Sequence, residues 1–285
     1  MIPTDPLIAQ LAVPVAATVI AVVLIRLMGG AGAGARAAAF GVPIGLIAGY
    51  AVLPGLPWTP PVEAADKLIW LALGGGLLGL LVDVSVHGRV IASILGFLWP
   101  AVAIAWLVGP AIFTADEATL YRYAEVAVVL GVITVRLNQI GASGFTGSAA
   151  AAVIAAGLGA LAFVSGGSVA TAIGFPLAAA GLGWLMCNWP AWRFPFGVAG
   201  LLGGTGTAMA LAAHAALFTT TNSSLILIVL AAVLVEPLAR AWVARNALAK
   251  AEAAQPLAFA VLVAIPAAIA VVLALFAPDI VPSIF

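Results

Sequence analysis

Long apolar runs separated by short polar stretches repeat along the whole chain. A transmembrane helix needs about 20 mainly apolar residues to cross a hydrocarbon core of roughly 30 Å. Ten runs of about this length lie at residues 8–28, 38–53, 68–86, 90–110, 124–137, 148–164, 169–187, 198–218, 225–243 and 257–276. The pattern predicts an all-α polytopic membrane protein with about ten transmembrane helices. The second, fifth and sixth runs are short, so the alternative of one re-entrant pair and a count of eight or nine stays open.

Composition places the chain in a bilayer. Of its 285 residues, 65% are hydrophobic and 7% are charged, whereas a soluble domain carries roughly 25% charged residues. The 10 basic and 10 acidic side chains are too few to cover a protein of this size in water, so lipid must cover it. The formal charge of +0 offers no basic surface for nucleic acid. A single cysteine, Cys187, permits neither an internal disulfide nor a cysteine metal cluster.

The basic residues predict an orientation, because cytoplasmic loops near helix ends are enriched in Lys and Arg. With the N-terminus outside, Lys67 and Arg122 fall outside and the other assigned basic residues fall on the cytoplasmic side. Those are Arg26, Arg36, Arg89, Arg136, Arg193, Arg240, Arg245 and Lys250. We therefore expect both termini to be extracytoplasmic, in a bacterial inner membrane. The start, MIPTDPL, lacks the Lys or Arg of a signal peptide, so the first run is interpreted as a retained helix.

The two halves of the chain share a weak similarity. Residues 39–44 read AFGVPI and residues 172–177 read AIGFPL, which pairs Pro43 with Pro176. The third and eighth predicted helices both carry glycine clusters, at Gly74, Gly75 and Gly76 and at Gly203 and Gly204. Five helices per half is an odd number, so residues 1–143 and 144–285 are predicted to form an inverted-topology repeat. The alternative is chance similarity, because Ala, Gly and Pro are frequent in this chain.

In transporters with such repeats, Gly- or Pro-interrupted helices at corresponding places point to a substrate site near the membrane midplane. The predicted fourth and ninth helices are also interrupted, by Pro100 and Pro237. With Pro43 and Pro176, these prolines are kinks and hinge candidates. The glycines are binding candidates in this interpretation, and close helix packing is the alternative.

Glu236 is the sharpest single candidate. It lies eleven residues after Leu225 (236 minus 225), or roughly 16 Å into the ninth helix at ~1.5 Å per residue. An acid at that depth is a functional-site hypothesis by default. Beside Pro237, which leaves carbonyls of the preceding turn unpaired, it could bind a proton or a cation. The alternative is a structural salt bridge with Arg240 one turn on.

Four further polar residues are candidates. Asp83 and His214 occupy corresponding places in the third and eighth predicted helices, and inverted topology puts Asp83 toward the cytoplasm and His214 toward the outside. Asp83 marks either a ligand site or the membrane interface. His214 is either a proton shuttle or a helix-packing hydrogen-bonding group. Thr205 and Thr207 accompany the second glycine cluster and offer hydroxyls to a ligand or to exposed carbonyls. Arg136 and Asn138 are interpreted as an interface anchor.

These features favour a secondary transporter of a small, not highly charged solute that works by alternating access, coupled to a proton or cation gradient if at all. The alternative is a structural or assembly subunit of a membrane complex. An intramembrane enzyme is disfavoured, because the sequence contains no HExxH or GxSxG motif. No GxxxxGK[ST] loop occurs either, so direct use of ATP is not expected. We also expect no metal or other cofactor, and lipid is the expected partner.

Size, the five-plus-five arrangement and a glutamate in the ninth helix loosely resemble the drug/metabolite transporter superfamily. The resemblance implies a ten-helix transporter fold. Members of that family usually have cytoplasmic termini, whereas the basic residues here predict extracytoplasmic ones. No residue role is transferred from the family.

Overall fold

The computed structural model describes residues 6–52, 61, 63–85, 88–141, 144–189, 193–246 and 254–276. Within these ranges the chain forms helices and no strand. The elements are α1 (Pro6–Gly29), η1 (Gly30–Gly34), α2 (Ala35–Ala37), η2 (Ala38–Phe40), α3 (Gly41–Val52), α4 (Lys67–Ser85), α5 (Arg89–Val108), η3 (Gly109–Phe113), α6 (Glu117–Gly141), α7 (Thr146–Val164), α8 (Ser168–Cys187), α9 (Gly197–Gly200), η4 (Leu201–Thr205), α10 (Gly206–Phe218), α11 (Ser223–Leu230), α12 (Ala232–Arg245) and α13 (Gln255–Phe276). The predicted all-α class is confirmed for the described residues.

Nine segments of the described ranges are long and apolar enough to cross a membrane. The first, Ile8–Val52, has 45 residues and would extend about 68 Å as one straight helix. It instead contains α1 and α3, which pack against each other. Gly30 begins the reversal between them with a φ of 65°, a conformation that glycine adopts without steric cost. The first two predicted spans therefore lie in one continuous helical segment.

The fifth and sixth predicted spans are longer in the structure than their apolar runs. The run at 124–137 lies within α6, and the run at 148–164 lies within α7. Polar residues such as Glu117 and Arg122 lower the hydropathy at the start of α6 without ending the helix. Both helices are long enough to cross the membrane, so neither is a short re-entrant segment.

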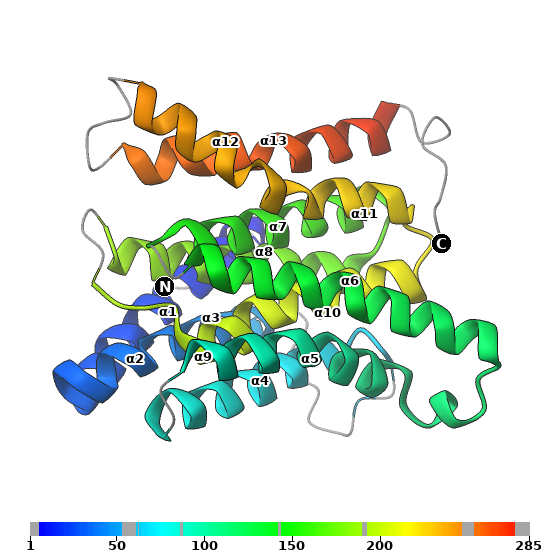
Figure 1. Cartoon of the computed structure of the whole chain (residues 1–285), viewed down its shortest axis with the longest axis horizontal. Coiled ribbons are helices and arrows are strands. Elements are labelled where there is room, and N and C mark those ends of the chain that lie inside the picture. The colour runs from blue at the N-terminus through cyan, green and yellow to red at the C-terminus, as the bar shows by residue number, and fades with distance from the viewer. Residues whose placement is uncertain are drawn as a thin grey trace.

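The long helices lie alongside one another (Figure 1), with α12 and α13 at one edge and α4 and α5 at the opposite edge. Helices α1, α3 and α8 pack on each other, and α7 packs against α8, α10, α11 and α13. The span formed by α9, η4 and α10 contacts α4, α5, α6, α7 and α8. It is also the most buried span, with 83% of its apolar window buried.

Large apolar side chains cover the outside of the bundle. Leu27, Leu81, Leu234 and Val261 are 74%, 64%, 74% and 67% exposed. An apolar exterior of this extent is unfavourable in water and favourable against acyl chains. The protein is therefore a multi-pass α-helical membrane protein.

The two glycine clusters meet at a close crossing of α4 and η4. A Cβ placed on Gly75 would lie 2.8 Å from the main-chain O of Leu202, and one on Gly203 would lie 2.8 Å from Gly76 Cα. These distances leave no room for a side chain, so the glycines permit backbone-to-backbone packing. Gly204 faces Val42 instead. Gly74 faces outward with open space around it, so it takes no part in the crossing.

The four candidate hinge prolines lie inside or near the start of continuous helices. Pro100, Pro176 and Pro237 are inside α5, α8 and α12. Pro43, in the first turn of α3, packs beside Gly76, with 2.7 Å between its Cγ and a Cβ built on that glycine. The ninth predicted helix is interrupted at Ala231, between α11 and α12, rather than at its proline. Hinge motion at these prolines stays a prediction.

Candidate functional site

Glu236 lies in a three-residue ion cluster. Its Oε2 accepts a hydrogen bond from Arg136 Nη2 at 3.1 Å, and its Oε1 pairs with Arg240 Nε. Glu236 is only 4% exposed, while the side chains of both arginines are 40% exposed. The buried carboxylate thus has a cationic partner on each oxygen, which offsets the cost of removing it from water.

The same cluster ties three helices together. Arg240 Nη2 donates to the main-chain O of Ile140 at 3.2 Å and to Thr146 Oγ1 at 2.8 Å. Ile140 and Thr146 stand at the end of α6 and the start of α7, and Arg136 is one turn before Ile140. Glu236 is therefore linked through Arg136 and Arg240 to the end of α6 and the start of α7. The structure places it against α6.

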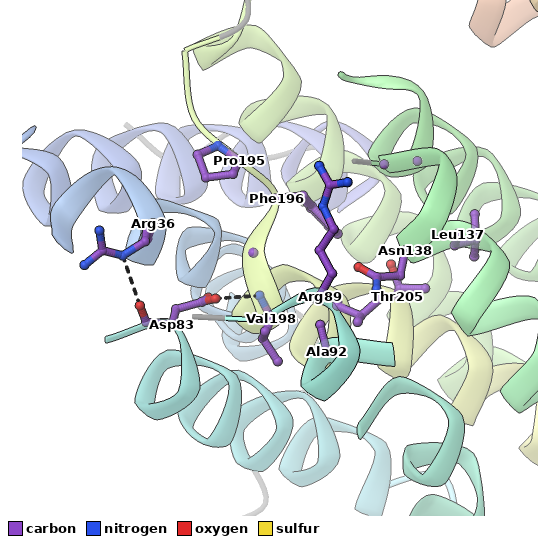
Figure 2. A pocket seen from close by; sticks show the side chains of 15 residues that line it. Arg36, Asp83, Arg89, Ala92, Leu137, Asn138, Pro195, Phe196, Val198 and Thr205 are labelled. Carbon is purple, nitrogen blue, oxygen red and sulfur yellow. Dashed lines mark hydrogen bonds between the residues drawn. The ribbon is translucent and has the colours of Figure 1, made fainter. Parts of the chain in front are cut away.

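A separate cavity of about 350 Å³ opens at the same end of the bundle. Its lining comes from α2, the end of α4, the start of α5, the end of α6, the start of α7, and α9 with η4. Both predicted halves contribute to it (Figure 2). The charged and polar side chains of the lining are Arg36, Asp83, Arg89, Asn138 and Thr205.

Asp83 joins the two halves at one wall of this cavity. Its Oδ1 accepts from the main-chain N–H of Val198 at 2.8 Å, and its Oδ2 from that of Ala199 at 2.9 Å. A Cβ on Gly197 would lie 2.6 Å from Oδ2, and Gly197 has a φ of 57°, so only glycine fits there. Arg36 Nε donates to the main-chain O of Asp83 at 3.2 Å. The carboxylate therefore caps the start of α9.

The two threonines of the eighth predicted helix have different surroundings. Thr205 lines the cavity, whereas the fully buried Thr207 donates its hydroxyl to the main-chain O of Gly203 at 2.6 Å. That carbonyl belongs to η4, a π-helical turn, and π-helical turns recur at functional sites. Thr205 therefore lies at the cavity wall, although it is only 1% exposed, and Thr207 supports the backbone.

His214 lies away from the cavity. It is 8% exposed and stacks on Phe218 with a centroid distance of 5.8 Å. Its Nδ1 is buried and has no hydrogen-bond partner among the described residues. The structure does not bring His214 to Asp83, Glu236 or the threonines.

Two arginines of the cavity were predicted from sequence only as markers of the cytoplasmic side. Arg89 is the first residue of α5, and Arg36 lies in α2. Asn138, interpreted as an anchor, also lines the cavity and donates its Nδ2 to Ser93 Oγ at 3.1 Å. Each of these residues lies near a helix end, beside the span that contains the second glycine cluster. Only the tertiary structure shows this proximity, so the sequence contained no direct indication of it.

Within the described ranges, no three residues of the His, Cys, Asp and Glu types group as ligands for a metal. In comparisons with known proteins, no family model, no curated protein and no solved structure matches this chain.

Proposed function

We propose that this membrane protein is a secondary transporter of a small solute that works by alternating access. The observation that supports it is the cavity beside the α4–η4 crossing, because its lining is drawn from both predicted halves. Cavities of roughly 300–1,000 Å³ are typical of small-molecule sites, and about 350 Å³ suits a small solute. The glycine-lined crossing also brings backbones of the two predicted halves together beside the cavity.

The proposal includes ten membrane passes in an inverted five-plus-five repeat. If α1 and α3 each cross the membrane, the nine segments of the described ranges become ten. Packing within the halves supports the repeat: α1 packs on α3 as α7 packs on α8, and α5 on α6 as α12 on α13. The matched glycine clusters also contact each other, as expected near a two-fold axis.

The proposed orientation places the cavity end in the cytoplasm of a bacterial cell with this protein in its inner membrane. Arg36 and Arg89 lie at the cavity, and Arg136 and Arg240 lie near the same helix ends. Lys67 instead donates to the main-chain O of Leu107, at the other end of α5. This separation of basic residues supports the predicted sidedness.

A second candidate function is a structural or assembly subunit. The ion cluster favours it, because both oxygens of Glu236 are engaged by arginines, and the cluster links α12 to α6 and α7. We therefore do not place ion coupling at Glu236 in the transport proposal.

Access to Thr205 separates the two functions. The test uses Thr205→Cys in a Cys187→Ser background, with a membrane-impermeant thiol reagent applied to right-side-out and inside-out vesicles. A transporter exposes the cavity alternately, so the introduced thiol should react from both sides. Reaction from one side only would favour the subunit. Thr207→Cys is the matched control, since Thr207 lies outside the cavity lining and packs against the η4 backbone, and it should not react from either side.

A further inference from the structure

The net charge of the cavity lining is carried by Arg89. Of the three charged residues in the lining, Arg36 and Asp83 lie together, with Arg36 bonded to the main chain of Asp83. Their formal charges sum to zero. The Asp83 carboxylate is also engaged by two backbone N–H groups. One positive charge remains, and it belongs to Arg89.

Arg89 has no hydrogen bond or ion pair with any described residue. It is the first residue of α5, where the helix dipole disfavours a cation, so it does not stabilise its own helix. Arg89 is exposed and lines the cavity together with Asn138 and Thr205, and Figure 2 shows its side chain extended among the lining residues. The guanidinium is therefore presented to whatever occupies the cavity.

We propose that the cavity binds a small oxyanion, a carboxylate or a phosphate group, through Arg89 and the Thr205 hydroxyl. The planar guanidinium fork matches both groups with two parallel hydrogen bonds. The remaining walls include Leu137, Phe196 and Leu201, so the anion carries a small apolar part. This inference rests on the proposed function, because it identifies the transported solute as an anion. The sequence predicted a solute that is not highly charged, and the inference narrows this to a solute with one negatively charged group.

The oxyanion could belong to a soluble solute or to a lipid headgroup, and binding experiments can distinguish these sources. The full-length protein is placed in phosphatidylcholine nanodiscs and titrated with inorganic phosphate or hexanoate, and binding is followed by thermal unfolding and calorimetry. Tetraethylammonium chloride at equal ionic strength is the control salt. A second set of nanodiscs contains phosphatidylglycerol and no added soluble anion.

Saturable stabilisation by either soluble anion, absent with tetraethylammonium, is expected. Arg89→Gln should weaken binding by about tenfold or more, the effect of losing a charged hydrogen bond, and Arg89→Lys should weaken it less. Thr205→Val keeps the side-chain volume and should also weaken binding. Arg245→Gln is the matched control, because Arg245 is an exposed arginine at the end of α12 outside the cavity lining.

Stabilisation by phosphatidylglycerol alone that Arg89→Gln removes would assign the site to a lipid headgroup. Anion effects that are equal in wild type, Arg89→Gln and Thr205→Val would overturn the inference. If the protein binds the anion but the thiol of Thr205→Cys reacts from one side only, the anion site is supported and the transport function is rejected. If that thiol reacts from both sides but no anion binds, the transport function is supported and the anion site is rejected.

Discussion

Gly203 of η4 lies directly against Gly76 of α4, so close that a Cβ on Gly203 would be 2.8 Å from the Gly76 Cα. Both residues were singled out as members of corresponding glycine clusters in the two halves. Their contact joins the halves beside the cavity, at the start of the most buried span. The crossing therefore fixes the cavity wall as well as the core.

Adding a methyl group at this crossing should destabilise the protein. Gly203→Ala forces two backbones apart, and overpacking of this kind costs about 1–3 kcal/mol. Thermal unfolding in detergent should show a lower midpoint. The same cluster supplies the control: Gly74→Ala meets open space and should be neutral or raise the midpoint, because alanine favours helix by about 1 kcal/mol over glycine. Equal effects of the two changes would contradict the proposed crossing.

The ion cluster predicts an asymmetric response to neutralisation. Glu236→Gln removes the shared partner of Arg136 and Arg240, whereas Arg240→Gln leaves Glu236 paired with Arg136. The first change should therefore lower abundance and stability more than the second. Because both arginines are partly solvated, we expect a loss of about 1–3 kcal/mol for Glu236→Gln, below the 3–5 of fully buried pairs.

The double variant Glu236→Gln with Arg240→Gln tests the role of this cluster further. If the cluster is structural, the double variant should regain much of the abundance lost in Glu236→Gln, since one charge of each sign is gone. Full recovery of folding without recovery of solute flux would instead return a coupling role to Glu236.

Asp83 should matter through its two backbone hydrogen bonds. Asp83→Ala leaves the N–H groups of Val198 and Ala199 without their acceptor, at a cost of about 1–3 kcal/mol for buried groups. Asp83→Asn keeps one acceptor oxygen and should lose less. The comparison is made by thermal unfolding. Equal losses would show that charge, rather than capping, is what Asp83 supplies.

Sidedness is checked by cysteine labelling in the Cys187→Ser background. An impermeant reagent added outside intact cells should label Thr219→Cys and should not label Ala35→Cys. The same labelling pattern is expected for a cysteine near Pro60, on the outside, and for one at Ala249, on the cytoplasmic side. Both of these positions lie outside the described residues. A reversed pattern would overturn the orientation that the basic residues predict.

The sequence by itself determined where the membrane-spanning helices lie. The predicted spans 68–86, 169–187 and 257–276 match α4, α8 and α13 within two residues, because a bilayer demands a continuous apolar stretch of set length and sequence shows that directly. The run at 124–137 was too short because it stopped at polar residues, while the helix α6 continues through them.

Only the tertiary structure decided which polar groups meet. The sequence singled out Glu236, Asp83 and the glycines, since polar or small residues are conspicuous in apolar helices. It did not show that Arg136, one hundred residues from Glu236, supplies a second cation, or that Arg89 faces the cavity. Helical periodicity gives the position of a side chain along its own span, but the rotation and neighbours of that span are set by packing against the other helices.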